Sequence, residues 1–412
     1  MGNKLPEYDV LMFGLTRSDF PLSSVSLALA REWAKTNRVF YIDRPFSLKD
    51  IKDEWQQPGF KERLPALFSL GNPYKTLVYP ESSYTRVTPL VNLPINFLPE
   101  GPLFQNLNKL NSFLVQASVQ KLIHDYKIKN YVWFNSFLPV TLPVLPSSVF
   151  PKPLANVYQS MDEMSQEPYI ARHGVLAEKL ALKCCDLAVA TSTALCEQHE
   201  LSSGRKVHLM ANAADFSLFE NAMNKEFEMP VELKENSRKV IIYTGHYSDL
   251  RLDHELVRKI CARFPEALVL FVGTFISEDL AKEGLLEIPN LKFTGNKPID
   301  QLPAYLRHSH VAIIPYKKNE LTKGIYPLKI NEYLAAGIPV VSTRFSKDIA
   351  AFDGPASLAD SHEQFLMQVD SSLNARIEHG MESRIQTAQL NTWRKRIETF
   401  EAILENYLET KP

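Results

Sequence analysis

The chain has 412 residues, which is too long for one hydrophobic core of ordinary size and predicts two domains of about 200 residues each. Hydrophobic residues make up 45% and charged residues 23% of the chain, the balance of a globular protein that folds in water. The 46 basic and 47 acidic residues leave a net charge of -1, so the chain as a whole attracts neither nucleic acid nor an anionic membrane.

Four cysteines lack the spacing of a metal site, and a secreted disulfide framework would need more of them. The first residues show no charged segment followed by an apolar one, and the sequence has no apolar stretch of membrane-spanning length. We therefore expect a cytoplasmic protein.

The first half of the chain alternates between strand and helix patterns, beginning with a strand at 9–14, a helix at 21–35 and a strand at 38–43. Further strands are expected at 75–79, 130–134, 154–159, 186–191 and 206–210, and helices at 105–126 and 175–184. The sector 46–103 is rich in proline and aromatic residues, which favours an irregular insertion over a strand-helix repeat.

The alternation starts again after residue 239. Strands are predicted at 240–245, 267–273, 291–294, 311–316 and 340–343, with helices at 252–263, from Asp300 onward and at about 327–336. Near-continuous Val, Ile and Leu runs between helices predict parallel sheets covered on both faces. In such sheets ligands bind beyond the carboxyl ends of the strands, where Gly14, Gly245 and Gly273 lie.

The segment 326–343 predicts a loop, a helix about ten residues long and a buried strand. Pro327 suits a first helical position and Gly337 a helix end. The helix start offers unpaired N–H groups to an anion, and Lys329 and Glu332 share one helix face. That order suits a nucleotide whose phosphates meet the lysine and whose ribose meets the glutamate. An exposed ion pair on an ordinary surface helix is the alternative.

Several motifs occur in an order that resembles the GT-B glycosyltransferases, in particular those that build bacterial surface polysaccharides of the teichuronic-acid and xanthan type. They are Asp9 to Gly14, Arg38 to Asp43, Val157 to Glu163, Asp186 to Ser192, Ala211 to Phe219, Ile241 to Gly245, Pro327 to Thr343 and Thr392 to Arg394. The resemblance implies two Rossmann-like, doubly wound α/β domains that face a central cleft. It also implies an acceptor-binding domain at 1–218, a nucleotide-sugar-binding domain at 219–391 and a helix at 392–412 that crosses back to the first domain.

The resemblance implies that a nucleotide-diphosphate sugar binds the second domain and a saccharide or lipid-linked saccharide acceptor binds the first. Glu332 matches the acid that holds the donor ribose, and Lys329 matches a diphosphate-binding lysine. The donor-binding candidates are Gly245, His246, Arg251, Gly273, Tyr326, Pro327, Leu328, Lys329 and Glu332. The candidates on the acceptor side of the cleft are Gly14, Thr16 and Glu163.

Asp162 follows a strand-like run of the first domain, at an edge expected to face the cleft. In related polysaccharide enzymes an acid at this place acts as general base, which requires a carboxylate within about 2.6–3.2 Å of the acceptor hydroxyl. The alternative is that Asp162 or Glu163 caps the following helix.

Two features depart from common patterns. Many retaining members of the family carry a further glutamate eight residues before the ribose-binding one, and here that place is Gly324. The chain has no Asp-x-Asp element, so we expect no metal and no other cofactor, with leaving-group charge neutralised by Lys329, helix N-termini and Arg251. Activity that survives EDTA is the expected result.

Two other functions remain open at this point: a nucleotide-sugar epimerase of the same fold, and an inactive nucleotide-binding scaffold. A lipid-linked acceptor would bring the protein into peripheral contact with the inner face of the cell membrane. Apolar residues at 90–98 are candidates for that contact, and a packed core or a dimer contact is the alternative.

Overall fold

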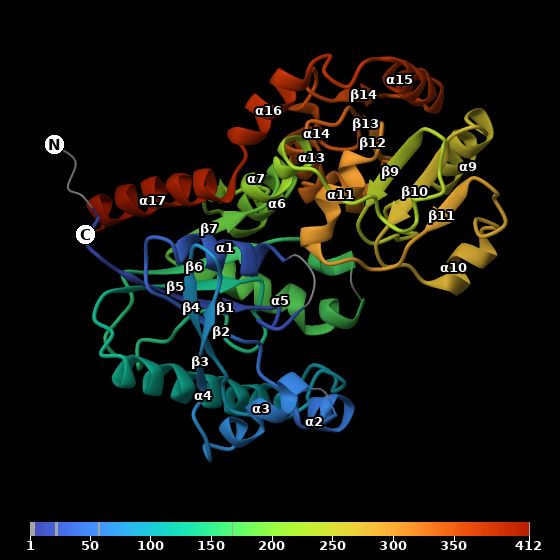
Figure 1. The fold of residues 1–412 in the computed structure, drawn as a ribbon. Helices are drawn as coiled ribbons and strands as arrows, with labels where there is room; N and C mark the ends of the chain where they lie inside the picture. Colours follow the sequence, from blue (N-terminus) through green and yellow to red (C-terminus); the bar gives the residue numbers. More distant parts are fainter. Residues whose placement is uncertain (1–4, 21–23, 57, 167, 412) are drawn as a thin grey trace. The chain divides into compact units, whose positions relative to one another are not determined.

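The computed structural model describes residues 5–20, 24–56, 58–166 and 168–411, and Figure 1 shows the course of the chain. Its contacts divide the chain into two compact units. Unit 1 contains Met1–Thr191, Leu195–Met210 and Ile397–Pro412, and unit 2 contains Ser192–Ala194 and Ala211–Arg396. The second unit thus begins at Ala211, ahead of the predicted boundary after residue 218.

Unit 1 is built on an eight-stranded sheet in the order β3-β4-β2-β1-β5-β6-β7-β8. Every neighbouring pair is parallel except β3 and β4, which form an antiparallel pair at one edge. The strands are β1 (Asp9–Gly14), β2 (Val39–Ile42), β3 (Tyr74–Val78), β4 (Ser83–Val87), β5 (Tyr131–Ser136), β6 (Ala155–Ser160), β7 (Leu187–Ala190) and β8 (Val207–Leu209).

Unit 2 has a six-stranded, all-parallel sheet in the order β11-β10-β9-β12-β13-β14. The strands are β9 (Val240–Thr244), β10 (Leu268–Val272), β11 (Leu291–Phe293), β12 (Val311–Ile314), β13 (Val340–Thr343) and β14 (Ser357–Ala359). Strands β9, β10, β12 and β13 are buried along their whole length, as their apolar runs predicted.

Both sheets contain the strand order of dinucleotide-binding folds, in which the first strand of the unit lies at the centre and the chain then crosses to its other side. The crossing point lies between β1 and β5 in unit 1 and between β9 and β12 in unit 2. Ligands of open α/β sheets bind at this point, beyond the carboxyl ends of the strands. The predicted pair of Rossmann-like domains is confirmed.

Helices cover the sheets of both units. The helices that precede β7 in the chain belong to unit 1. They are α1 (Val25–Trp33), α2 (Leu48–Glu54), α3 (Pro58–Leu67), α4 (Pro102–Asp125) and α5 (Pro168–Cys184), with the short η1 (Met164–Gln166). They are followed by α6 (Thr193–Ser203), α7 (Phe216–Phe219), α8 (Asn221–Asn224), α9 (His254–Arg263), α10 (Ser277–Lys282), η2 (Ile299–Gln301), α11 (Leu302–Arg307), α12 (Glu320–Lys323), α13 (Leu328–Ala335), α14 (Lys347–Ala350), α15 (His362–Asn374), α16 (Met381–Gln389) and α17 (Trp393–Thr410). The predicted helix 21–35 begins outside the described residues, since 21–23 are not among them, and α1 ends at Trp33.

The insertion expected at 46–103 contains more regular structure than the sequence indicated. It folds into α2, α3 and the β3–β4 hairpin, which adds two strands to the edge of the sheet. Strand β3 has no buried residue, because an edge strand with one open face carries no apolar run. Helix α3 contains Pro65, and a proline in the middle of a segment disfavours the prediction of a helix there.

The predicted return of the last helix to the first domain is confirmed. Within α17, the side chains of Ile397, Phe400 and Leu404 are fully buried. The Phe400 ring lies 5.4 Å from that of Trp33 in α1 and 5.6 Å from that of Phe134 in β5, both in edge-on packing. Residues 397–411 therefore complete the core of unit 1.

Helix α4 covers the opposite face of this sheet. Trp133 of β5 packs in the same cluster as Val115 and Val119 of α4, whereas the next residue, Phe134, points to α17. None of the helices among the described residues is long and apolar enough to cross a membrane.

Candidate functional site

The signature helix is α13, and it is shorter than expected. Pro327 is its N-cap, with φ −75° and ψ 125°, so the expectation that it occupies the first helical position is wrong by one residue. Ala336 caps the C-terminus and Gly337 follows with φ +69°, the left-handed geometry that ends a helix, as predicted. The described side chains provide no cap for the N-terminus of α13.

Lys329, in the first turn of α13, reaches the carboxyl ends of the two strands at the crossing point of unit 2. Its ammonium donates a 2.8 Å hydrogen bond to the hydroxyl of Tyr316, which follows β12. It also lies 5.1 Å from the ring centre of Tyr243 in β9 and 5.2 Å from that of Tyr316, within cation–π distance of both. The lysine is therefore held at the place where such a sheet binds its ligand.

Two predicted glycines, Gly245 and Gly273, form the turns next to this lysine, and both have a positive φ. A Cβ atom on Gly273 would stand 2.1 Å from the carbonyl oxygen of Gly245, so the turns after β9 and β10 are in direct backbone contact. A Cβ atom on Gly245 would lie 3.5 Å from the Lys329 ammonium nitrogen. The structure thus brings three donor-binding candidates together.

The loop after β9 returns to the segment after β12. Leu252 forms an antiparallel bridge with Tyr316, and the carbonyl of Arg251 accepts a 2.8 Å bond from the amide of Lys317. The charges of Lys329 and Arg251 lower the pKa of Tyr316 below its ordinary value, although burial opposes this. Arg251 therefore lies close enough to add a second positive charge to the site.

Glu332 lies one turn further along α13 and is buried. Burial raises the pKa of its carboxyl to about 7, and the positive charge of Lys329 partly offsets this effect. A carboxyl in this state gains from a ligand that donates hydrogen bonds to it, because such bonds stabilise the ionised form.

The remaining donor-binding candidates contact other groups of the protein or pack in its interior. The Nδ1 atom of His246 lies 2.9 Å from the hydroxyl of Thr274, which follows Gly273, so the histidine joins the same two turns. Leu328 is half-buried at the start of α13. Tyr326 points into the interior, where its hydroxyl lies 3.3 Å from Asn331 and 3.4 Å from Asn391.

Sequence reasoning missed Tyr243 and Tyr316, which hold Lys329. The available signal was a tyrosine at the carboxyl end of each of two strands, both followed within a few residues by loops of the predicted ligand edge. It was read only as a strand ending, because the strand order that makes β9 and β12 neighbours is not visible in sequence.

Unit 1 has a pocket of about 360 Å³ at its own crossing point. Leu15 after β1 and the segment from Phe137 to Thr141 after β5 line it, together with α2 and the first turns of α4. Its other lining residues include Arg44, Asn92, Ile95, Phe97 and Met164. The lining is part apolar and part polar, which suits a ligand with both characters.

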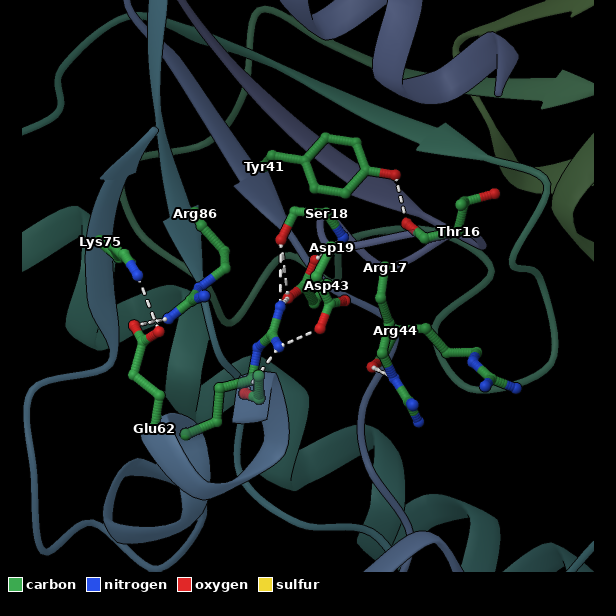
Figure 2. Close-up of polar contacts among 12 residues, drawn as sticks. Thr16, Arg17, Ser18, Asp19, Tyr41, Asp43, Arg44, Glu62, Lys75 and Arg86 are labelled. Carbon is green, nitrogen blue, oxygen red and sulfur yellow. Dashed lines mark hydrogen bonds and ion pairs between the residues drawn. The ribbon is translucent and has the colours of Figure 1, made fainter. Parts of the chain in front are cut away.

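The loop after β1 that borders this pocket is held by buried polar contacts (Figure 2). Asp43, just after β2, accepts a 2.7 Å bond from the amide of Ser18 and pairs at 3.0 Å with Arg63, and both charged side chains are fully buried. Thr16 accepts a bond at its carbonyl from the hydroxyl of Tyr41 (Figure 2). Gly14 gives this tyrosine its room, since a Cβ atom there would lie 2.1 Å from the hydroxyl.

Asp162 and Glu163 follow β6, which neighbours β5 in the same sheet. Glu163 accepts bonds from the hydroxyl of Ser165, at 2.7 Å, and from Gln198. Burial acts to raise the pKa of Glu163, but these hydrogen bonds outweigh it and lower the pKa. Glu163 therefore helps to fix the turn, and Asp162 beside it is half-buried.

The described residues contain no group of three or more His, Cys, Asp or Glu side chains arranged to hold a metal ion. The charged groups that the unit 2 site offers to a ligand are those of Lys329, Arg251 and Glu332.

Glu332→Gln should stabilise the ligand-free protein by an amount that grows between about pH 5 and pH 8. The unfolded carboxyl ionises near 4.5 and the folded one near 7, so the cost of the buried charge develops across this window and is complete above it. Each pKa unit corresponds to about 1.4 kcal/mol. Melting temperatures across the pH series measure the difference.

The matched control is Glu320→Gln, which changes a glutamate with an exposed side chain in α12. Its effect on the melting temperature should stay nearly constant across the same series. A Glu332→Gln difference that shrinks as the pH rises would contradict the buried, destabilised carboxylate.

Comparisons of the sequence relate part of this chain to known glycosyltransferases. Residues 238–373 match the family model described as Glycosyl transferases group 1. A stretch of 146 residues is 31% identical to TuaH of Bacillus subtilis (strain 168), by its name a teichuronic acid biosynthesis glycosyltransferase. The match covers 35% of this chain and 36% of the length of TuaH.

Solved structures match nearly the whole chain at low identity. Sucrose-phosphate synthase from Thermosynechococcus elongatus has a TM-score of 0.63 at 12% identity, with 98% of this chain and 100% of that one covered. Anabaena HepE, in complex with UDP and glucose, has a TM-score of 0.65 at 14% identity, with 97% and 100% covered. The α,α-trehalose 6-phosphate synthase from Burkholderia multivorans has 0.65 at 12%, with 99% and 100% covered.

These likenesses extend over both units, and the family match lies within the unit that holds Lys329 and Glu332. The chain therefore has the GT-B fold, and its residues 238–373 match the Glycosyl transferases group 1 family model.

Proposed function

We propose that this protein transfers a sugar from a nucleotide-diphosphate sugar to a polysaccharide or lipid-linked saccharide acceptor, without a metal ion. The observation that carries the proposal is the Lys329 ammonium beside Gly245, at the crossing point of the unit 2 sheet. The hydrogen bond to the hydroxyl of Tyr316 uses one of the three donors of the ammonium, so other donors can bind a ligand phosphate.

The diphosphate would bind Lys329, Arg251 and the N-terminal amides of α13. Two full positive charges and a helix start favour an anion of this kind, since a helix N-terminus contributes about 0.3–1 kcal/mol and each charged hydrogen bond about 1.5–3 kcal/mol. Glu332 lies one turn away and would accept hydrogen bonds from the ribose hydroxyls. HepE, which shares the fold, is known in complex with UDP and glucose, and this supports the ligand class.

In the transfer, an acceptor hydroxyl oxygen forms a bond to the anomeric carbon of the donor sugar. The bond from that carbon to the diphosphate oxygen breaks, and its electron pair leaves with the nucleoside diphosphate. Asp162 would take the hydroxyl proton. The positive charges of Lys329 and Arg251 would stabilise the charge that develops on the leaving group, which is catalysis by preorganised electrostatics.

The acceptor would occupy the pocket at the crossing point of unit 1. Its mixed lining suits a saccharide joined to an apolar group better than a small polar sugar. The name of TuaH, which places it in teichuronic acid biosynthesis as a glycosyltransferase, supports an acceptor of cell-surface polysaccharide chemistry.

Lys329→Ala should weaken the binding of a UDP- or GDP-sugar by roughly 10- to 100-fold, because one charged hydrogen bond to phosphate is lost. Calorimetric titration of the nucleotide sugar measures this, and Lys329→Met removes the charge while keeping an unbranched side chain of similar length. Lys292→Ala, which removes an exposed lysine of β11, is the control and should bind like the wild type. Equal affinities for all variants would refute the role of the lysine.

Asp162→Asn should lower kcat by roughly 100-fold or more while the KM for the donor stays near the wild-type value, because an amide cannot take the proton of the acceptor hydroxyl. Glu163→Gln is the neighbouring control, and its effect on kcat should be small, since its carboxylate is engaged with Ser165 and Gln198. Turnover of the asparagine variant at the wild-type rate would exclude the general-base role.

Turnover should persist after dialysis against EDTA, because the lysine and the arginine supply the positive charge that a divalent ion would otherwise provide. Release of nucleoside diphosphate in the presence of acceptor, with and without added magnesium, measures this. Activity lost in EDTA and restored by magnesium would overturn the metal-independent mechanism.

A further inference from the structure

A buried polar network adjoins the turn that carries Asp162. Ser160, the last residue of β6, donates a 2.8 Å hydrogen bond from its hydroxyl to the carboxylate of Glu178 in α5. The hydroxyl of Tyr158 donates a 3.0 Å bond to the same oxygen atom. The Nε2 atom of His199 in α6 lies 2.9 Å from the hydroxyl oxygen of Ser160. All four residues are buried, and the most accessible of them, Glu178, is 6% exposed. We call these four residues the Ser160 network.

The direction of each hydrogen bond follows from the available protons. An ionised Glu178 can only accept, so Ser160 donates its single hydroxyl proton to it, and His199 must donate from Nε2 to the serine oxygen. Burial lowers the pKa of His199, and the charge of Glu163 opposes this only in part, which agrees with a neutral imidazole. Burial raises the pKa of Glu178 to about 7, although the bonds from Ser160 and Tyr158 stabilise its charge. The histidine, the serine and the ionised glutamate thus form a directed chain of donors and acceptors.

Serine, histidine and an acid also form the catalytic triads of hydrolases, but their order here differs. In such a triad the histidine lies between the serine and the acid. In the Ser160 network the serine lies between His199 and Glu178. Ser160 is also 0% exposed, so a substrate does not reach its hydroxyl. The network therefore acts through the residues that it holds in place.

Helix α6 holds the turn on both sides of Asp162. His199 bonds Ser160, which precedes the aspartate by two positions. Its neighbour in the helix, Gln198, donates a bond from its side-chain amide to Glu163, which follows the aspartate. Because both contacts come from consecutive residues of one helix, they fix the backbone on which Asp162 is placed.

The end of β7 adds contacts to the same turn. The hydroxyl of Thr191, which follows β7, donates a 2.7 Å bond to the carbonyl of Met161. The amide of Thr191 donates a 3.1 Å bond to the carbonyl of Ser160. Both residues just before Asp162 are therefore held by their backbone carbonyls, and one of them also by its side chain.

We infer that His199 and Glu178 are positioning residues, which act through Ser160 to hold Asp162 at the distance that proton transfer from an acceptor hydroxyl requires. The inference rests on the proposed function, because it takes Asp162 as the general base. Such a base must lie within about 2.6–3.2 Å of the oxygen whose proton it takes. A displacement of about 1 Å can cost roughly 100-fold in rate, even when the changed residue lies far from the reacting atoms.

The Ser160 network contributes little to stability compared with what it can contribute to geometry. Replacing buried polar groups by apolar side chains of similar volume is often neutral or stabilising, because burial of polar groups is costly. Satisfied polar networks instead fix one arrangement of their atoms, since each donor requires its acceptor. Apolar residues such as Leu195 and Ala190 fill the space around this network. A fixed turn is therefore the property that the network adds.

Hydrogen exchange measures the turn directly and needs no substrate. In Ser160→Ala and in His199→Leu, the segment 160–165 should exchange its amide hydrogens about tenfold faster than in the wild type, because the contacts that hold it are lost. Exchange in β2, which lies three strands away from β6 in the sheet, should be unchanged.

Hydrolysis of UDP-glucose measures the effect on the reaction. This probe is chosen because HepE, of the same fold, is known in complex with UDP and glucose, and water replaces the acceptor hydroxyl as the group that loses a proton to the base. Ser160→Ala and His199→Leu should each lower kcat about tenfold, while the KM for UDP-glucose stays within about twofold of the wild-type value, because the proposed donor site lies in unit 2. His199→Gln, which offers an amide nitrogen in place of Nε2, should recover most of kcat. The double variant of Ser160→Ala and His199→Leu should lose no more than either single variant, since both changes break one chain.

The matched control is Leu195→Ala. Leu195 lies one turn before His199 in α6, is 1% exposed and packs in the same cluster as Tyr158. Its truncation leaves a cavity and should lower the melting temperature at least as much as His199→Leu, while kcat and the exchange of 160–165 stay near the wild-type values. A loss of kcat as large as that of His199→Leu would assign the effect to a general loosening of unit 1 and overturn the inference.

Two other results would overturn it. One is unchanged exchange of 160–165 in both Ser160→Ala and His199→Leu, and the other is a raised KM with an unchanged kcat. A failure of the proposed function has a different signature. A wild type that shows no thermal shift with UDP- or GDP-sugars would refute that function, whereas the exchange experiment would still decide whether the Ser160 network holds the turn.

Discussion

The donor site depends on one interaction. The ammonium of Lys329 lies beside the rings of Tyr243 and Tyr316, at the carboxyl edge of a parallel sheet. The hydroxyl of Tyr316 satisfies one of the three donors of Lys329 without neutralising its charge. Cation–π contacts add about 0.5–2 kcal/mol and fix the position of the stem. Burial raises the pKa of Glu332 to about 7, so this carboxyl is only partly ionised at neutral pH and offsets only part of the lysine charge. A bound phosphate completes the electrostatics of this arrangement.

The same topology places a binding region on each unit. A sheet whose chain crosses from one side of its first strand to the other leaves two loops that diverge, and the space between them remains open. In unit 2 that space holds Lys329, Gly245 and Tyr316. In unit 1 it is the pocket between Leu15 and Phe137. The units differ in chemistry, since the site of unit 2 is cationic and the pocket of unit 1 is part apolar and part polar.

The sequence predicted those parts of the fold that local patterns determine. Buried strands such as β9 and β10 follow from uninterrupted apolar runs, and the end of α13 follows from Gly337, which alone among common residues adopts φ +69° without strain. The return of α17 followed from its apolar spacing, and Phe400 indeed lies against Trp33.

Features that depend on contacts between residues far apart in the chain could not be predicted from the sequence. The partnership of Lys329 with Tyr243 and Tyr316 requires the strand order, which no local pattern contains. Strand β3 was predicted at 75–79, but its partner β4 was missed, because the sequence Ser-Tyr-Thr-Arg-Val of β4 has no apolar run. The role of Asp162 stays a prediction, since it concerns a substrate that lies on the acceptor side.

The last helix has a consequence for how the protein is made. Trp33 and Phe134 emerge early from the ribosome, but the aromatic ring that covers them belongs to Phe400. Unit 1 therefore lacks part of its core until residues 397–411 have been synthesised, and the apolar side chains that they cover stay exposed until then. All residues of unit 2 are synthesised before Ile397, so unit 2 is complete before unit 1 although most of it follows unit 1 in the chain.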